Sequence, residues 1–227
     1  MDISFLITSH NEGDELKKVL DQISSFIVKN QTNDEIVVLD DYSDNPKTLE
    51  ILNEAVKHPF VTIFHNRLNK DFGSHKTAGS RACKKDYIVQ LDADETLAAP
   101  LLENLRDILE ANPSVELYRV PRVNLLRGLT PLDAVKWGWN VSTLPEYPGI
   151  QVINWHNGDY QSRIYRNVES VKWNKKLHET VVGAAVSTDL PKEADYAIIH
   201  DKTIERQRAQ NEFYNKNWSQ EANMGRG

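Results

Sequence analysis

The chain of 227 residues has one cysteine, no excess of positive charge and no long apolar run. The single cysteine, Cys83, excludes a disulfide framework and a cysteine-based zinc site within one chain. The net charge of −6 argues against a surface built mainly to bind nucleic acid, because such a surface is basic. No apolar stretch approaches the roughly 20 residues that span a membrane, and Met1–Ile7 does not suit a signal peptide. We therefore expect no integral membrane segment and a cytoplasmic location.

Two glycine-rich phosphate-binding motifs are also missing. The sequence has no G-x-G-x-x-G after its first apolar run and no G-x-x-x-x-G-K-[ST] anywhere. Their absence disfavours a dinucleotide-dependent dehydrogenase and a P-loop enzyme. The polar loop at 69–76 contains one glycine and precedes a predicted helix. Its Lys76 is a candidate phosphate ligand, and a solvated lysine is the alternative.

Apolar runs and apolar stripes alternate along the first half of the chain. Short runs rich in β-branched residues predict strands, and apolar residues at helical spacing predict helices between them. This alternation is typical of an α/β fold with a mostly parallel sheet and helices on both faces, which binds ligands at the carboxyl ends of its strands. The strands are expected at 3–7, 36–39, 61–64 and 87–91, and the helices near 16–27, 46–56, 75–84 and 101–109.

The second half is less regular. A strand is expected at 116–120, several tryptophans follow among prolines and glycines, and a polar helix is expected from about Thr203 to Trp218. This pattern indicates a smaller region of loops and mixed strands. Because no linker, repeat or low-complexity segment separates the two parts, we expect one domain over 1–227, with halves 1–112 and 113–227.

Polar, acidic clusters follow three of the predicted strands, at residues 8–12, 40–44 and 92–95. One acidic turn is often only a helix cap, but three at one edge of a sheet indicate a site. Asp92 and Asp94 are two residues apart, so in extended backbone both project to one side. Two such carboxylates suit a hard divalent cation, and Mg²⁺ or Mn²⁺ would also bridge the oxygens of a diphosphate.

These segments resemble family 2 glycosyltransferases of the GT-A fold. Residues 7–12 (Ile-Thr-Ser-His-Asn-Glu) resemble the opening nucleotide-binding turn of that family, although the common form is Pro-x-Tyr-Asn-Glu. Residues 36–44 resemble its second nucleotide-binding turn, and residues 92–94 (Asp-Ala-Asp) resemble its D-x-D metal motif. The order and spacing of the three also match, over about residues 1–110.

The second half resembles a bacterial and phage-type branch of the same family. Residues 159–166 are similar to its Q-x-R-[IL]-[FY]-[RK] segment, and residues 173–179 to its W-x-x-x-x-H-E element. His200 resembles the late histidine that often completes the metal site of GT-A enzymes. If a phage encodes the chain, the expected location is the cytoplasm of the host.

The resemblance implies a metal-dependent, inverting transfer of a sugar from a nucleotide diphosphate sugar, with UDP as the expected nucleotide, to an acceptor hydroxyl. The first half, 1–112, would bind the nucleotide and the second half, 113–227, the acceptor. Mn²⁺ or Mg²⁺ would be the cofactor. The implied residues are Glu179, or Asp159 as second choice, for the base; Thr8, His10, Asn11, Glu12, Asp40, Asp41, Lys76, Asp92, Ala93 and Arg163 for the nucleotide sugar; Asp92, Asp94 and His200 for the metal; and Trp139, Trp173 and His178 for the acceptor.

Two other functions remain open at this point. A nucleotidyltransferase has a similar sheet, although its first turn is usually glycine-rich and basic, whereas residues 8–13 are acidic. A binding module would keep the nucleotide-sugar site without transfer. The acceptor also remains open among a glycan, a lipid-linked sugar, a protein side chain and a modified nucleobase, and the sequence indicates neither the donor sugar nor the oligomeric state.

Overall fold

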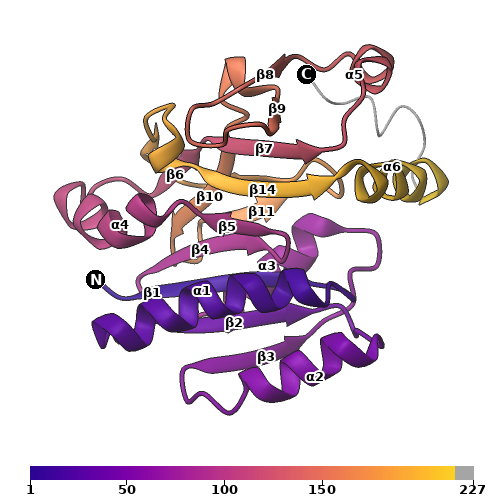
Figure 1. Cartoon of the computed structure of the whole chain (residues 1–227). Coiled ribbons are helices and arrows are strands. Elements are labelled where there is room, and N and C mark those ends of the chain that lie inside the picture. Colours follow the sequence, from indigo (N-terminus) through magenta and orange to yellow (C-terminus); the bar gives the residue numbers. More distant parts are fainter. Residues whose placement is uncertain (218–227) are drawn as a thin grey trace.

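The structure is a computed structural model that describes residues 1–217. Its main sheet has seven strands, and Figure 1 shows four of them in the first half running in one direction. From one edge to the other the strands are β13 (Ser187–Asp189), β6 (Leu117–Val120), β10 (Gln161–Arg166), β4 (Tyr87–Asp92), β1 (Ile3–Ser9), β2 (Glu35–Asp40) and β3 (Val61–His65).

The pairing confirms the predicted mostly parallel sheet. Each pairing among β1, β2, β3 and β4 is parallel, as is that of β13 with β6. β10 is the exception, because it lies between β4 and β6 and is antiparallel to both. The first and second halves of the chain therefore share one sheet.

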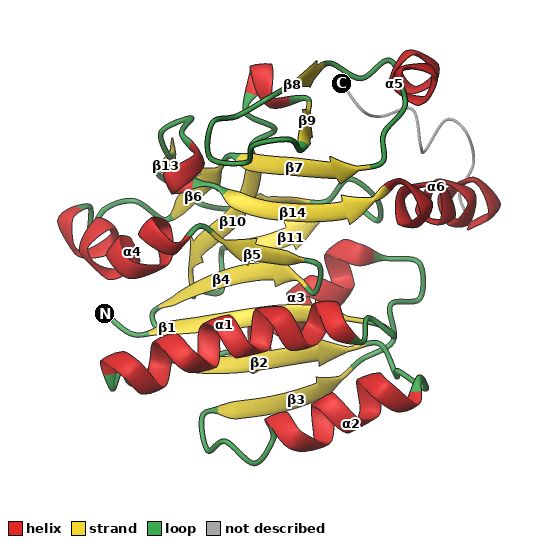
Figure 2. Cartoon of the chain, in the orientation of Figure 1, coloured by secondary structure: helices red, strands yellow, loops and turns green. Residues whose placement is uncertain are grey.

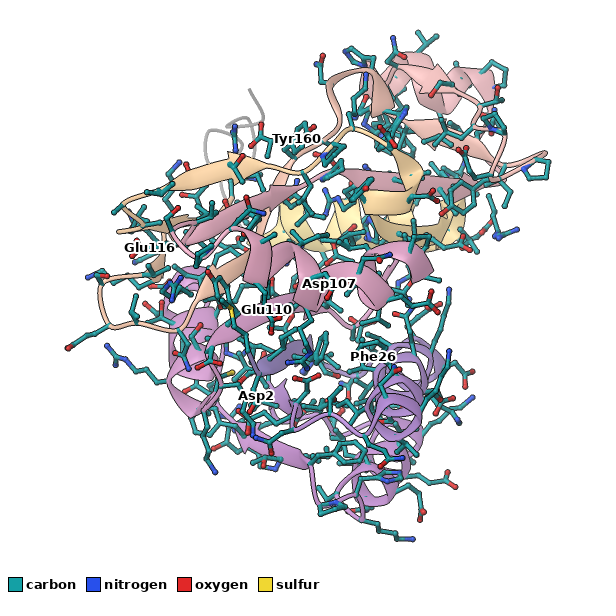
Figure 3. All side chains as sticks on the ribbon, turned by 90° about the vertical axis from the view of Figure 1, so that its left-hand side faces the viewer. Asp2, Phe26, Asp107, Glu110, Glu116 and Tyr160 are labelled. Atoms are coloured by element: carbon teal, nitrogen blue, oxygen red, sulfur yellow. The ribbon has the colours of Figure 1, made fainter. Side chains whose placement is uncertain are left out.

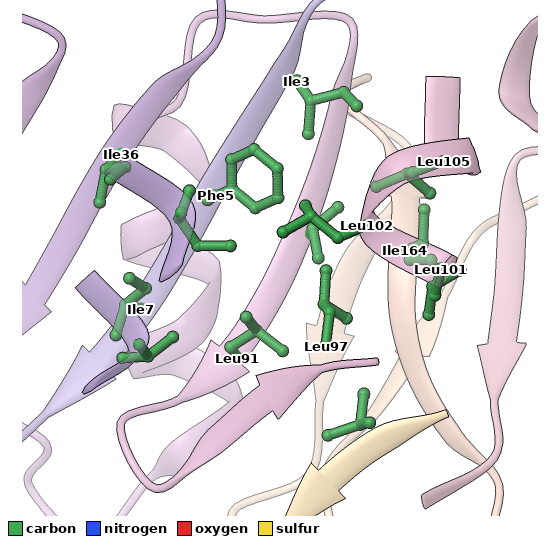
Figure 4. Packing of buried hydrophobic residues seen from close by; sticks show 14 of the residues in the cluster. Ile3, Phe5, Ile7, Ile36, Leu91, Leu97, Leu101, Leu102, Leu105 and Ile164 are labelled. Carbon is green, nitrogen blue, oxygen red and sulfur yellow. The ribbon is translucent and has the colours of Figure 1, made fainter. Parts of the chain in front are cut away.

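Helices cover both faces of this sheet, as predicted (Figure 2). One face packs against α1 (Asp14–Asn30), α2 (Pro46–Ala55) and α4 (Ala99–Ala111). Figure 4 shows Phe5 and Leu102 meeting in this core. The other face packs against α3 (Phe72–Ala82) and contains Leu6, Tyr165 and Trp173. α3 lies close to the strands, because a Cβ at Gly79 would stand 2.9 Å from Leu6.

Local sequence sets the starts of two of these helices. Asn45 caps α2, since its side chain accepts hydrogen bonds from the backbone of Lys47 and Thr48, and Pro46 occupies the first turn. Asp71 caps α3 by accepting from the backbone of Ser74. α3 therefore begins three residues earlier than the apolar pattern predicts.

The second half builds a smaller sheet and a hairpin beside the main sheet. Its last helix confirms the predicted polar helix as far as Asn217, while Trp218 lies outside the described residues. The smaller sheet has the order β5 (Glu95–Leu97), β14 (Ile198–Thr203), β7 (Arg122–Arg127), β9 (Gln151–Ile153) and β8 (Val141–Ser142). The hairpin is β11 (Lys172–Asn174) with β12 (Thr180–Val182), and the remaining elements are α5 (Pro131–Trp137), α6 (Ile204–Asn217) and the 3₁₀ turns Trp155–Asn157 and Ala194–Tyr196.

The carboxyl ends of β1, β2 and β14 point to the same side of the molecule, where α6 begins (Figure 1). The opposite edge is shown in Figure 3, with Asp2, Glu110 and Glu116 labelled. There the amino group of Met1 binds Glu110 at 2.8 Å. No helix within residues 1–217 has the length and apolar character needed to cross a membrane.

Candidate active site

The predicted D-x-D segment forms the turn between β4 and β5. Asp92 is the last residue of β4, Ala93 and Asp94 make the turn, and Glu95 begins β5. The backbone of Ala93 donates to the carbonyl oxygen of Thr8 at 3.0 Å, which ties the turn to the end of β1. The prediction of extended backbone with both carboxylates on one side is wrong, because the chain reverses between them.

Asp92 is surrounded by cations and a hydroxyl. Its Oδ1 accepts from Thr8 Oγ1 at 2.7 Å and lies 3.1 Å from Lys76 Nζ, while its Oδ2 accepts from Arg163 Nη2 at 2.9 Å. Burial alone would raise the pKa of Asp92, but Arg163 and Lys76 hold it well below its usual range. Asp92 is therefore an ionised carboxylate whose charge the protein itself already balances.

Arg163 is directed into the protein. Its guanidinium donates to Gln90 Oε1, to Asp92 Oδ2 and, at 2.9 Å, to Glu95 Oε1, while only 3% of the residue is exposed. Its Nε has no partner among the described residues. Its observed contacts hold two carboxylates in place, and its predicted contact with a diphosphate stays a prediction.

Lys76 connects Asp92 with the predicted base. Its Nζ lies 2.7 Å from Glu179 Oε1 and 4.8 Å from the centre of the Trp173 ring. Because Lys76 is only 2% exposed, the alternative of a solvated lysine is wrong. Burial would raise the pKa of Glu179, but the charge of Lys76 outweighs it and lowers that pKa.

Asp94 faces a different set of residues, which come from β14 and α6. Its Oδ2 lies 3.2 Å from His200 Nε2, 3.3 Å from Lys202 Nζ and 3.5 Å from Arg206 Nη2. Burial acts to raise the pKa of Asp94, but His200 and Lys202 together keep it well below its usual value. Arg206 also pairs with Glu12, whose pKa is raised because burial outweighs that pairing.

The hydrogen bonds around His200 determine which of its ring nitrogens carries a proton. Asn124 Nδ2 donates to Asp159 Oδ2 at 2.7 Å, since an ionised carboxylate can only accept. The amide oxygen of Asn124 must therefore face His200 Nδ1, which lies 2.9 Å away and donates to it. Nε2 lies 3.2 Å from the ionised Asp94, to which it can only donate, so it offers a lone pair to a cation only without its proton.

Asp94 and His200 fit a Mn²⁺ or Mg²⁺ ion in the chemistry of their donors. A carboxylate oxygen and an imidazole nitrogen lie together, with the second ring nitrogen held by Asn124, as is usual for a metal-binding histidine. Among residues 1–217 no three His, Cys, Asp or Glu side chains are grouped as a metal site. Asp92, the third predicted ligand, is occupied by Lys76 and Arg163. Such ions often take only one or two carboxylates and complete their coordination with phosphates and water.

Asp159 and Arg122 connect Glu95, which begins β5, with Asn124, the partner of His200. Arg122 Nη1 donates to Glu95 at 3.1 Å and its Nε donates to Asp159 at 2.9 Å. Burial would raise the pKa of Asp159, but Arg122 and Asn124 lower it. Both oxygens of Asp159 accept hydrogen bonds, since Gln161 donates to the second one at 3.0 Å. Asp159 therefore positions Asn124 and Arg122, and its alternative role as the base stays a prediction.

The turns after β1 and β2 are bound to each other. Asn11 has a left-handed backbone (φ 59°), and its side-chain oxygen accepts from the backbone of Asp44 at 2.9 Å and of Asn45 at 2.8 Å. Asp40 is fully buried and accepts from Ser43 and from His65. These predicted nucleotide ligands hold the turns together.

His10 and Asp41 are more accessible at the same edge. The side chain of His10 is 57% exposed and that of Asp41 is 21% exposed, and His10 Nδ1 lies 2.9 Å from the carbonyl oxygen of Asp41. The guanidinium of Arg67 lies over the ring of the neighbouring Tyr42, 4.5 Å from the ring centre, and Tyr42 is 50% exposed. The predicted contacts of His10 and Asp41 with a nucleoside stay a prediction.

The three predicted acceptor residues lie in different surroundings. Trp173 is 6% exposed and donates through Nε1 to the Tyr165 hydroxyl at 2.9 Å. Trp139 packs against Trp137, with ring centres 4.6 Å apart, in a cluster of the smaller sheet. His178 precedes Glu179, has a left-handed backbone (φ 52°), and its buried Nε2 has no partner among the described residues. Their contact with an acceptor stays a prediction.

Sequence reasoning missed several charged residues of this network. The signal for two pairs was alternation in a strand, which puts i and i+2 on one face. Arg122 and Asn124 are such a pair on β7, and His200 and Lys202 are such a pair on β14. Glu95 directly follows the D-x-D segment and is 1% exposed, and Arg206 lies in the first turn of α6.

Comparison with known proteins gives a family and a fold. The family model described as glycosyl transferase family 2 matches residues 4–178. A curated relative from Pseudomonas fluorescens, undecaprenyl-phosphate 4-deoxy-4-formamido-L-arabinose transferase, is 32% identical over 127 residues, which cover 54% of this chain and 36% of the relative. Poly(ribitol-phosphate) beta-N-acetylglucosaminyltransferase TarP of Staphylococcus aureus is 27% identical, over 49% of this chain and 34% of its own length. The chain thus spans about a third of these relatives.

Solved structures show the same fold. S. aureus TarS aligns with a TM-score of 0.59 at 13% identity, over 89% of this chain and 37% of that chain. The fragment TarS 1-349 in complex with UDP-GlcNAc aligns with a TM-score of 0.56 at 16% identity, over 89% of this chain and 59% of the fragment. With the family model matching most of its length, the chain belongs to glycosyltransferase family 2 and has the GT-A fold.

Proposed function

We propose that the protein transfers a sugar from a UDP-sugar to an acceptor hydroxyl with inversion at the anomeric carbon. The observation that carries this proposal is one connected network at the carboxyl edge of the sheet, which runs from Glu179 through Lys76 and Asp92 to Arg163. It continues through further ion pairs and hydrogen bonds to His200 and Asp94. The binding of UDP-GlcNAc by TarS, which has the same fold, supports a UDP-sugar as the donor.

Asp94 and His200 are the proposed ligands of Mn²⁺ or Mg²⁺, with diphosphate oxygens in the remaining positions. When bound, the ion supplies stabilisation of the charge that develops on the leaving diphosphate. Lys76 Nζ, placed between Asp92 and Glu179, is the proposed second positive charge for that diphosphate. His10 and Asp41 are the proposed contacts of the nucleoside.

Glu179 is the proposed base. The acceptor hydroxyl gives its proton to the Glu179 carboxylate, and its oxygen attacks the anomeric carbon from the face opposite the diphosphate. The new glycosidic bond forms as the bond between the anomeric carbon and the phosphate oxygen breaks. Glu179 is favoured over Asp159 because its carboxylate is bound mainly to one side chain, Lys76, whereas three side chains occupy the oxygens of Asp159.

A panel of nucleotide sugars, assayed with Mn²⁺ or Mg²⁺ and with a chelator, tests this function. The expected result is release of UDP from one UDP-sugar, lost with the chelator and in the Glu179→Gln variant. Release of pyrophosphate from a nucleoside triphosphate would instead indicate a nucleotidyltransferase. Calorimetric binding of a UDP-sugar, without turnover against any acceptor or water, would indicate a binding module.

A further inference from the structure

Three exposed lysines lie beside Glu179 and form what we call the basic rim: Lys70, Lys175 and Lys176. None of the three forms an ion pair with any of residues 1–217. Lys175 and Lys176 precede Glu179 by four and three residues, and Lys70 lies two residues before Phe72, whose backbone amide donates to the carbonyl oxygen of Lys176. The rim is therefore exposed positive charge without an ion-pair partner among residues 1–217, on the segment that contains the proposed base and on the loop bonded to it.

The segments around the rim have an excess of positive charge, whereas the whole chain has an excess of negative charge. Residues 66–76 and 172–179 together contain six Lys or Arg and two Asp or Glu, whereas the chain has 27 and 33. A local excess of one sign in a protein of the opposite net charge attracts ligands of the other sign to that place. The excess at the rim favours an anionic ligand there.

The backbone holds the rim in position. The amides of Phe72 and Gly73 donate to the carbonyl oxygens of Lys176 and Lys175, each at 3.1 Å, so the two loops are joined. The approach is so close that a Cβ at Gly73 would lie 2.5 Å from the carbonyl oxygen of Lys175. Lys70 and Lys175 have left-handed backbones, with φ of 58° and 71°. The three ammonium groups are thereby mounted on fixed loops.

We infer that the basic rim binds a phosphate group of the acceptor, and that the acceptor is a hydrophilic polyol or glycan phosphate. This inference rests on the proposed function, since a hydroxyl activated by Glu179 must belong to a molecule that passes over the rim. The diphosphate of the donor is assigned to Asp94, His200 and Lys76, which belong to the connected network of the site, whereas the rim lysines are exposed and take part in none of its ion pairs. The rim is therefore left to the acceptor.

Two other anionic partners fit the rim less well. A lipid surface is bound by cations together with apolar side chains that enter it. Within residues 1–217, no large exposed apolar side chain lies at 66–76 or 172–179. Nucleic acid is held mainly by many contacts of Lys and Arg with its phosphates. The rim offers three lysines, on a chain with a net charge of −6.

The test is charge reversal at Lys175 and Lys176 with a matched control. The variant K175E/K176E is compared with K84E/K85E, the same dipeptide at the opposite edge of the sheet, before β4. The probes are a ribitol phosphate oligomer, the same oligomer without phosphate, phosphatidylcholine vesicles containing a polyprenyl phosphate, and duplex DNA. Binding of a UDP-sugar is measured in parallel on every variant.

The expected result is that K175E/K176E weakens binding of the ribitol phosphate oligomer by about tenfold, the effect of losing about 1.4 kcal/mol of attraction. K84E/K85E and UDP-sugar binding stay unchanged, and added salt weakens wild-type binding. Equal binding of the oligomer by wild type and K175E/K176E, or binding of the oligomer that does not need its phosphate, overturns the inference. So does stronger binding to the vesicles or to DNA than to the oligomer. If wild type fails to bind any UDP-sugar, the proposed function fails, while the oligomer still reports on the rim.

Discussion

Asp92 and Asp94 are separated by one residue, yet the protein treats them differently. Asp92 meets Lys76 and Arg163, which are almost completely buried and stand on α3 and β10 of the main sheet. Asp94 meets His200, Lys202 and Arg206, which stand on the last strand and on α6. Under the proposed function, Asp92 keeps its counter-charges, while a metal and a diphosphate replace part of the counter-charge of Asp94. The D-x-D motif would then combine a structural carboxylate with a ligand-binding one.

The Asp94→Ala variant tests whether Asp94 has the ligand-binding role that distinguishes it from Asp92. We expect donor turnover to fall by about a thousandfold or more, as when a group that stabilises transition-state charge is removed. The circular dichroism spectrum should stay that of the folded protein, because Lys202 keeps Gln210 and Arg206 keeps Glu12 as partners, while the free energy of unfolding should fall because the nearly buried Lys202 loses its carboxylate partner. Released UDP measures the effect, and Asp201→Ala on the same strand is the control. Full activity of Asp94→Ala would refute the assigned role.

Arg163→Met tests the counter-charges of Asp92. The change leaves Glu95, which is 1% exposed, with less positive charge around it, so we expect the free energy of unfolding to fall by about 3–5 kcal/mol. Arg119→Met is the control, because it breaks an exposed pair with Asp189 and should cost about 0–1 kcal/mol. Denaturant titrations compare the two. Similar destabilisation by both variants would show that the contacts of Arg163 with Asp92 and Glu95 do not stabilise the fold more than an exposed ion pair does.

Asn124→Leu sharpens the comparison on the Asp94 side. Loss of the group that orients His200 should weaken Mn²⁺ binding by about 10–100-fold. Electron paramagnetic resonance of Mn²⁺ measures the affinity, and ¹⁵N shifts of His200 report whether Nδ1 still carries the proton. An unchanged affinity together with an unchanged tautomer would show that Asn124 does not position His200.

Lys76→Gln should lower turnover, because Lys76 is the proposed second charge for the diphosphate, and its smaller, diagnostic effect is a shift in pH dependence. Lys76 lowers the pKa of Glu179, so its removal raises that pKa. A base acts in its ionised form, and the acid limb of the kcat/KM profile should therefore move to higher pH. Lys76→Arg, which keeps the charge, should restore the limb toward its original position. If the acid limb of Lys76→Gln stays in place or moves to lower pH, Lys76 does not lower the pKa of the group that acts as the base.

The first half of the fold was readable from sequence because its elements are set by neighbouring residues. The apolar runs at β1, β2 and β4 and the cap at Asn45 act over a few positions. β10 was not readable in the same way, since its place between β4 and β6 depends on pairings across more than 40 residues. Length and alternation of a segment do not specify its partner strand.

Asp92 and Asp94 could be singled out from sequence, because acidic turns that are contiguous in sequence follow the predicted strands, while Glu179 was singled out by the family resemblance. Their partners Arg122 and Arg206 come from distant segments, and no local spacing links them to the turn. For the same reason Arg163 was assigned to a diphosphate, although its contacts in the structure are with carboxylates.

The antiparallel strand β10 also has a consequence for biosynthesis. During translation β4 emerges about 70 residues before β10, and until then one side of β4 has no strand to pair with. An unpaired, apolar strand edge is a template for association between nascent chains. Ribosome-bound chains that stop short of residue 161 should therefore be the most aggregation-prone, and release of the strand Gln161–Arg166 from the exit tunnel is the event that closes the edge.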